Sequence, residues 1–339
     1  MTNRLKAYRY LENMQQSKLA EILKMPTSTL SGLENDTRDF KGDFSKLGYS
    51  DARIEDIPEM SPPLHRHRVS TTVKGKNKAT EQLRLAGELY QFLAGSSDHL
   101  KSFSEKQYKL PLPSPTGNDQ LEEYAVEIRE DILQVLHDEP IGNLTKKVEN
   151  LGICLIPIRV EGIDGLSSFI GEKRQPVIGL SPGPGISGER FRFTLAHEFA
   201  HLFLHTTKND DTEAQANYLA GAILFPYEPF HEAMQSIEKD PSLKNFVLLK
   251  RKWKVSVGAM IYRAKELGYI TPERFRSLQI QKAPWKKSEP EESAIDYPTL
   301  LQEAIDAQGG FSSVYENFGL NISHVQSLCN WQTTLKLIN

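Results

Sequence analysis

Residues 191–205 read FRFTLAHEFAHLFLH, and this stretch decides what kind of domain surrounds it. Its apolar positions predict a buried helix, in which His197, Glu198 and His201 are the polar exceptions. Two histidines four residues apart lie on one helix face, so both imidazoles can reach one ion. A bound metal would offset the cost of burying these polar groups. The alternative is a structural helix whose histidines only form hydrogen bonds.

A catalytic metal needs further groups around these histidines. Glu198 lies beside the histidine face, where it reaches a metal-bound water rather than the metal, as zinc hydrolases require. His205 lies about 12 Å along the helix from His197, too far to share the ion, and suits the helix C-terminus instead. Glu213, which begins the next helical pattern, is therefore the predicted third ligand. Asn217, one turn further on, is expected to orient a ligand.

The ligand set and nearby polar residues extend this hypothesis. Two histidines and a glutamate suit Zn²⁺, the predicted cofactor, although manganese and iron also accept such ligands. Tyr227 and Arg263 have the chemistry to stabilise an oxyanion in the transition state. A purely structural role is the alternative for both side chains.

The sequence on either side of the metal motif predicts a mixed fold. Helical patterns at 119–138 and 143–152 precede short apolar segments at 153–160, 165–171 and 176–182, which read as strands. After Ala214 the chain is mostly helical to about Ser277. We expect an α+β, mostly helical protein with a small three- or four-stranded sheet. Either strand of the hairpin 165–182 is expected to be an edge that receives an extended peptide.

Two segments carry a family resemblance. RFRFTLAHEFAHLFLH, followed by EAQANYLAGAILFP, resembles the ImmA/IrrE metallopeptidases, and the likeness covers roughly residues 140–270, including the hairpin. The resemblance implies a zincin-like fold with zinc on His197, His201 and Glu213, and with Glu198 as general base. Known members of the family cut repressor proteins in bacteria and their mobile elements, so it also implies a protein substrate.

The N-terminal segment MQQSKLAEILKMPTSTLSGLENDTR (residues 14–38) resembles an XRE-type helix-turn-helix domain. The resemblance implies DNA as a partner and a homodimer on a symmetric site. Lys24, however, stands where that family usually has a turn glycine. Residues 1–60 also hold nine Lys/Arg against ten Asp/Glu, whereas DNA readers carry local positive charge. Docking of a protein partner is therefore the alternative. The resemblance places four residues against DNA: Gln16, Thr27, Ser28 and Ser31.

Composition sets the limits of the whole chain. With 39% hydrophobic and 25% charged residues, no long apolar run, a polar start and two cysteines, the sequence predicts a cytoplasmic protein without membrane spans. A net charge of −3 excludes electrostatic nucleic-acid binding by the molecule as a whole. Segments 248–270 and 314–331 also have a helix-turn-helix pattern, for which plain packing is the expectation. The predicted domains are 1–60 (helix-turn-helix), 61–118 (basic linker and connecting helix), 119–282 (peptidase) and 283–339 (C-terminal helical segment).

Together these features predict a zinc-dependent endopeptidase that cleaves a protein, a helix-turn-helix repressor by resemblance, through Glu-assisted attack of a zinc-bound water. One alternative is a DNA-binding transcriptional regulator whose zincin domain senses or binds a partner without turnover. Another is a toxin–antitoxin component. Glu198 favours the enzyme, because a pure binding module needs no base.

Overall fold

The computed structural model describes residues 3–38, 43–55, 57–67, 71–96, 100, 103, 110–183, 185–205, 209, 211–237, 240–286 and 288–332. The chain forms two compact units, and each contains segments that are far apart in the sequence. Unit 1 comprises Met1–Phe103, Gly152–Pro182 and Pro298–Asn339, and unit 2 comprises Ser104–Leu151 and Gly183–Tyr297.

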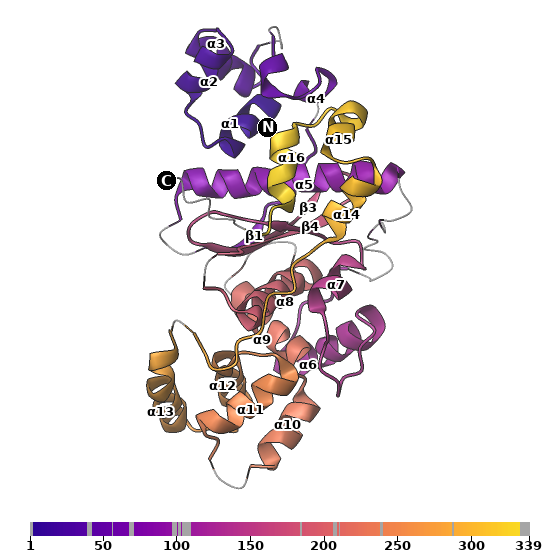
Figure 1. Ribbon diagram of the computed structural model, residues 1–339. Helices are drawn as coiled ribbons and strands as arrows, with labels where there is room; N and C mark the ends of the chain where they lie inside the picture. Colours follow the sequence, from indigo (N-terminus) through magenta and orange to yellow (C-terminus); the bar gives the residue numbers. More distant parts are fainter. Residues whose placement is uncertain are drawn as a thin grey trace. The chain divides into compact units, whose positions relative to one another are not determined.

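Unit 1 contains a sheet, one long helix and short helices from both ends of the chain (Figure 1). Its elements are α1 (Arg4–Leu11), α2 (Gln16–Ile22), α3 (Thr27–Glu34), the 3-10 turn η1 (Ser45–Leu47), α4 (Ala52–Glu55), β1 (Leu64–His67), α5 (Val73–Ser96), β2 (Cys154–Pro157), β3 (Ile163–Ile170), β4 (Gln175–Leu180), α14 (Leu300–Ala307), α15 (Phe311–Phe318) and α16 (Ile322–Cys329).

The four strands of unit 1 lie in the order β1-β3-β4-β2. β3 is antiparallel to both β1 and β4, and β2 runs parallel to β4. β3 and β4 are therefore the inner strands, and the prediction that one of them is a sheet edge is wrong. The cause is β1, which pairs with β3 although its sequence, LHRH, lacks the apolar alternation of a typical strand.

The long helix α5 lies along one face of this sheet (Figure 1). It approaches closely at Gly87, where an added Cβ would come within 2.5 Å of the Ile170 side chain. Leu83, Leu89 and Tyr90 are fully buried in the core that α5 shares with the sheet and the terminal helices. This burial of apolar surface is the main stabilising contribution in unit 1.

Unit 2 is helical in its described part and contains the metal motif. Its elements are α6 (Asn118–Glu127), the π-helical turn η2 (Ile128–Ile132), α7 (Leu144–Glu149), α8 (Gly188–Leu204), α9 (Thr212–Leu224), α10 (Tyr227–Gln235), α11 (Leu243–Trp253), α12 (Val257–Glu266), α13 (Pro272–Lys282) and the 3-10 turn η3 (Ala283–Lys286). Helices α8 and α9 pack against each other, and α9 also packs against α6 and α12.

The helix expected over residues 119–138 ends at Ile132. The Leu133 amide donates to the Ile128 carbonyl, which closes the π-helical turn, and Gln134 has a left-handed backbone with φ of 53°. The buried Arg129 guanidinium then donates to the carbonyls of Leu136 and Glu139. These bonds hold the chain in a tight loop in place of further helical turns.

The structure confirms the predicted fold class. The chain is α+β and mostly helical, with one small sheet. In the part of the chain that the structure describes, no helix combines the length and apolar character needed to cross a bilayer.

Candidate metal centre

Helix α8 positions the predicted metal ligands. The Ser187 side chain caps the N-terminus of α8 by accepting a hydrogen bond from the Arg190 amide. The negative charge of Glu189 in the first turn interacts favourably with the positive end of the helix dipole. From Leu195 onward every residue of α8 is buried. The expectation of a buried helix is therefore confirmed, and the polar exceptions lie inside it.

Three side chains converge beside this helix. The Nε2 atoms of His197 and His201 are 3.0 Å apart, and the Glu213 carboxylate oxygens lie 3.6 Å from His197 Nε2 and 3.7 Å from His201 Nε2. A tetrahedral zinc ion with bonds of about 2.0–2.1 Å holds its donor atoms about 3.3 Å apart. The donor set and its spacing therefore fit one metal ion.

The surroundings of the three donors differ. His197 and His201 are almost completely buried, whereas the Glu213 side chain is 30% exposed. Glu198 follows His197 in α8 and is fully buried. This arrangement places an acidic side chain in the protein interior, next in sequence to a candidate ligand.

A series of hydrogen bonds links the Nδ1 side of the His201 ring to His205 and Gln215. His201 Nδ1 lies 3.2 Å from His205 Nδ1, and His205 Nε2 lies 3.0 Å from Gln215 Oε1. The amide oxygen only accepts, so His205 Nε2 carries a proton and His205 Nδ1 accepts from His201 Nδ1. The lone pair of His201 is then on Nε2, which faces His197 and Glu213. Burial lowers the pKa of His205, consistent with this neutral ring.

The hydrogen bonds that link His201, His205 and Gln215 were not predicted from the sequence. The available signal was the spacing of His201 and His205, which repeats the i, i+4 relation of the first histidine pair. Asn217, the predicted orienting residue, lies half-buried in α9 one turn after Glu213. His197 Nδ1, in contrast to His201 Nδ1, is buried and has no hydrogen-bond partner among the described residues.

The two candidates for oxyanion stabilisation have other partners. Arg263 Nη2 lies 3.0 Å from each Glu122 carboxylate oxygen, and the Tyr218 hydroxyl donates to the same carboxylate at 2.7 Å. This buried group joins α12, α6 and α9. Tyr227 begins α10, is 39% exposed and stacks on the His231 ring.

The four predicted DNA contacts lie on α2, which Gln16 begins, and on α3. Thr27 and Ser28 are exposed at the start of α3, and Ser31 is half-buried. Gln16, however, donates its side-chain amide to the buried Glu34 carboxylate at 2.9 Å. Arg9 binds the same carboxylate. Gln16 therefore already has a structural partner within the helical group.

The three candidate metal ligands lie in a part of the chain that is similar to a known protein family. A search of curated proteins found no match to the chain. Residues 148–265 match a peptidase family model described as the IrrE N-terminal-like domain, which spans β2–β4 and α8–α11 and ends within α12. The match supports the resemblance to ImmA/IrrE peptidases and does not extend to the N-terminal helices. Residues 148–265, which include His197, Glu198, His201 and Glu213, are therefore similar to the IrrE N-terminal-like peptidase domain.

Proposed function

We propose that this chain is a zinc-dependent endopeptidase whose substrate is a protein, specifically a helix-turn-helix repressor. The observation that carries the proposal is the convergence of His197, His201 and Glu213 at zinc-ligand spacing, within the IrrE-like match. Two imidazole nitrogens and one carboxylate are a donor set typical of catalytic zinc, which keeps a further position open. The repressor as substrate rests on the family resemblance alone.

In this proposal each side chain has a defined task. His197, His201 and Glu213 hold the ion, which when bound supplies Lewis acidity toward the scissile carbonyl. The Glu198 carboxylate takes the proton of the attacking water and passes it to the leaving amine. The His205–Gln215 chain keeps the His201 lone pair on Nε2, and Asn217 supports the α9 side of the site.

The wider assignment follows the predicted domains. Residues 119–282 form the peptidase domain, residues 61–118 and 283–339 its flanking segments, and residues 1–60 a helix-turn-helix-like domain that docks DNA or a protein. The enzyme acts in the cytoplasm, and its N-terminal domain forms a homodimer. Tyr227 is the remaining candidate for transition-state stabilisation, because the Arg263 guanidinium binds Glu122.

Metal content tests the site directly. Wild type, Glu213→Ala and Asp211→Ala would be purified without a metal-affinity tag and measured by plasma mass spectrometry. Asp211 is an exposed carboxylate two residues from Glu213 and is the matched control. We expect about one zinc per chain in wild type and in Asp211→Ala, and a large loss in Glu213→Ala. A wild-type chain that binds no metal on titration would remove the peptidase proposal.

Turnover is tested separately with Glu198→Gln, which keeps the size of the side chain and removes the base. We expect this variant to retain zinc and to lose about 10²–10⁴-fold in cleavage rate on a repressor substrate. Zinc binding without any cleavage by wild type would instead favour the regulator, in which the domain senses a partner without turnover.

A further inference from the structure

Four helix pairs in the described part of the chain share one turn geometry. In each pair a residue with a left-handed backbone lies two positions before the N-cap of the second helix. The pairs are α1–α2, with Asn13 before Gln15; α2–α3, with Lys24 before Pro26; α11–α12, with Lys254 before Ser256; and α15–α16, with Gly319 before Asn321. Short turns of this kind occur in DNA-binding helix-turn-helix motifs, but geometry alone does not distinguish the four pairs.

Charge distinguishes them clearly. Residues 241–287, which include α11–α13, contain twelve Lys/Arg and two Asp/Glu, although the whole chain has a net charge of −3. Residues 1–60 are slightly acidic, and residues 298–332 contain three acidic residues and no Lys or Arg. A local excess of positive charge is the electrostatic signature of nucleic-acid binding, and among these pairs it is found at α11–α12.

Much of this charge lies on the surface. Lys244, Arg251 and Lys252 are exposed on α11 at spacings of seven and eight residues, which places them along one side of the helix. The remaining exposed cations of the group are Lys254 in the turn, Lys265 on α12 and Arg276 on α13. Two further cations, Lys250 and Arg263, are buried and paired with glutamates. The six exposed residues form what we call the cationic surface.

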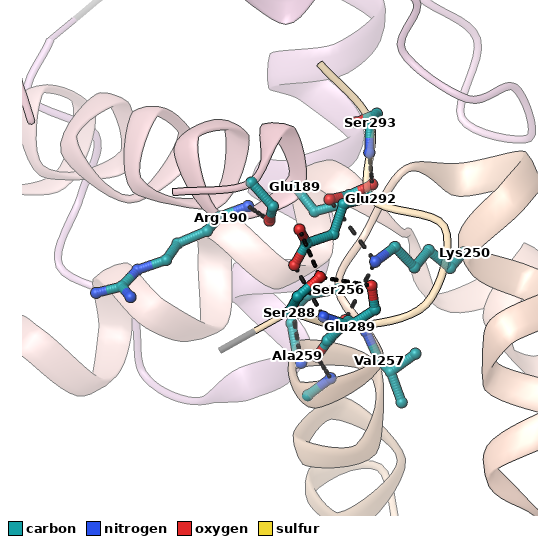
Figure 2. Close-up of polar contacts among 12 residues, drawn as sticks. Glu189, Arg190, Lys250, Ser256, Val257, Ala259, Ser288, Glu289, Glu292 and Ser293 are labelled. Carbon is teal, nitrogen blue, oxygen red and sulfur yellow. Dashed lines mark hydrogen bonds and ion pairs between the residues drawn. The ribbon is translucent and has the colours of Figure 1, made fainter. Parts of the chain in front are cut away.

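An acidic segment of the same unit already binds next to this surface. Residues 288–296, the acidic strap, contain four acidic residues and no Lys or Arg. The Glu289 carboxylate accepts from the backbone amides of Val257 and Gly258 at 2.8 and 3.1 Å (Figure 2). Lys250 Nζ lies 3.4 Å and Lys282 Nζ 3.8 Å from the same carboxylate.

Further contacts hold the part of the strap that follows Glu289. Glu291 forms two bonds of 2.5 Å with the Arg251 guanidinium, a member of the cationic surface. The Ser293 amide donates to Glu189 at 2.9 Å, and the Ser293 carbonyl accepts from the Gly188 amide. The N-terminus of α12, the second helix of the pair, therefore holds an anion supplied by the chain itself.

We propose that the cationic surface binds the phosphate backbone of duplex DNA, and that Glu289 and Glu291 of the acidic strap occupy part of the same area. In helix-turn-helix proteins the first helix crosses the backbone and the start of the second enters the major groove. Here α11 carries the cations, and the Glu289 carboxylate occupies the start of α12 in the manner of a phosphate. The inference is independent of the metal centre and would stand if the peptidase were inactive.

Binding would be measured with the full chain and a fluorescein-labelled duplex of mixed sequence, about 20 base pairs or two helical turns long. Fluorescence anisotropy at salt concentrations of about 50 to 200 mM gives the affinity and its salt dependence. We expect a dissociation constant on the order of micromolar at low salt that weakens steeply as salt rises.

Charge variants locate the surface. Lys244→Gln/Lys252→Gln should weaken binding about tenfold and reduce the salt slope by about two, whereas Lys244→Arg/Lys252→Arg should restore wild-type binding. The matched control is Lys18→Gln/Lys46→Gln, which removes two exposed lysines near α2 and η1 with the same change in net charge. The control should bind like wild type. If instead only the control loses affinity, the N-terminal helices bind DNA and the proposal fails.

The strap is tested by Glu291→Gln, which removes an exposed pair with little risk to folding. This variant should bind the duplex several-fold more tightly than wild type, because Arg251 is released. Unchanged affinity would refute the overlap of strap and DNA. A chain that binds no duplex, or that binds polyglutamate more tightly than DNA at equal salt, would assign the surface to an acidic protein and overturn the proposal.

Discussion

His201 has two ring nitrogens with different neighbours, and this asymmetry is the main feature of the site at the scale of single residues. Nε2 faces the other two donors, and Nδ1 faces His205, which in turn contacts Gln215. A ligand histidine whose second nitrogen is hydrogen-bonded keeps the correct tautomer and ring orientation. His205 and Gln215 would therefore act through His201 rather than on the metal or the substrate.

Removal of the Gln215 acceptor tests this role. Gln215→Leu should lower zinc affinity about 10- to 100-fold, because His205 then no longer fixes the His201 tautomer. Gln215→Glu retains an oxygen acceptor and should bind zinc nearly as well as wild type. Competition with a chromophoric chelator measures both affinities without reference to activity. Equal zinc affinity of Gln215→Leu and wild type would show that the hydrogen bonds through His205 and Gln215 have only a structural role.

Buried ion pairs determine how some elements pack. Arg4 in α1 forms two hydrogen bonds, of 2.7 and 2.8 Å, with the Glu88 carboxylate in α5. Both residues are buried, and the Arg4 guanidinium also donates to the Arg53 carbonyl. The pair therefore joins the first helix to the long helix that covers the sheet.

Arg4→Met should lower the free energy of unfolding by about 3–5 kcal/mol, because it leaves the Glu88 carboxylate buried without its charged partner. The double variant Arg4→Met/Glu88→Leu should recover much of this loss, since neither charge remains buried. Urea unfolding followed by circular dichroism measures both. A double variant that is less stable than Arg4→Met would contradict this account.

Gly188 connects α8 to the acidic strap at the scale of elements. A Cβ at this position would lie 2.4 Å from the Ala294 carbonyl oxygen and 2.5 Å from Ser293 Oγ. Because the first of these atoms belongs to the backbone, the strap would have to move. The absence of a side chain at residue 188 therefore permits the strap to pass so close to the start of α8.

Gly188→Ala should lower the free energy of unfolding by about 1–3 kcal/mol and speed proteolysis within residues 288–296. Gly221→Ala in α9 is the matched control, since the nearest atom to its added Cβ is 4.0 Å away. That variant should be neutral or more stable by up to about 1 kcal/mol, as expected for alanine in a helix. Thermal unfolding and limited digestion with a glutamate-specific protease would compare them, since residues 288–296 contain glutamates but no Lys or Arg. An unchanged stability and cleavage rate of Gly188→Ala would show that the strap moves aside without cost.

At the scale of the whole molecule, the two ends of the described chain meet inside unit 1. His324 in α16 lies 2.7 Å from the Glu12 carboxylate through Nε2 and 2.8 Å from the Tyr49 hydroxyl through Nδ1. The hydrogen bond with His324 lowers the pKa of Glu12 below its ordinary value of 4.5. Helices α14–α16 also contribute Ile305, Val314 and other buried side chains to the core of this unit.

The lowered pKa of Glu12 predicts how this contact depends on pH. The ionised carboxylate is favoured by folding, so its stabilisation is complete above pH 4.5 and is lost as pH falls through the lower folded-state value. Glu12→Gln should therefore be less stable than wild type at pH 7, by no more than about 1 kcal/mol for a part-exposed pair. The difference should vanish in acid. Urea unfolding at pH 7 and at pH 3 measures this difference in unfolding free energy. A difference that is the same at both pH values would show that the carboxylate charge has no role.

The sequence by itself predicted that His197 and His201 share one helix face, and it predicted the fold class that the structure confirms. Helical spacing is local, so two histidines four residues apart must lie on one face wherever that helix packs. The three strand segments at 153–182 were also predicted, because runs of buried β-branched residues have a local signature. The prediction of Glu213 required one further step, in which the next helix packs against the first, and α8 and α9 do so.

Only the tertiary structure decided which distant segments share a unit. β1 lies in a segment that reads as a basic linker, and its backbone pairing with β3 is seen only in the structure. The partners of Arg263 and Gln16 come from other helices, and no local pattern identifies them. The acidic strap contacts α11 and α12 through residues that are more than 30 positions apart in the sequence. The opposite charges of these segments are visible in the sequence, but only the fold brings them into contact.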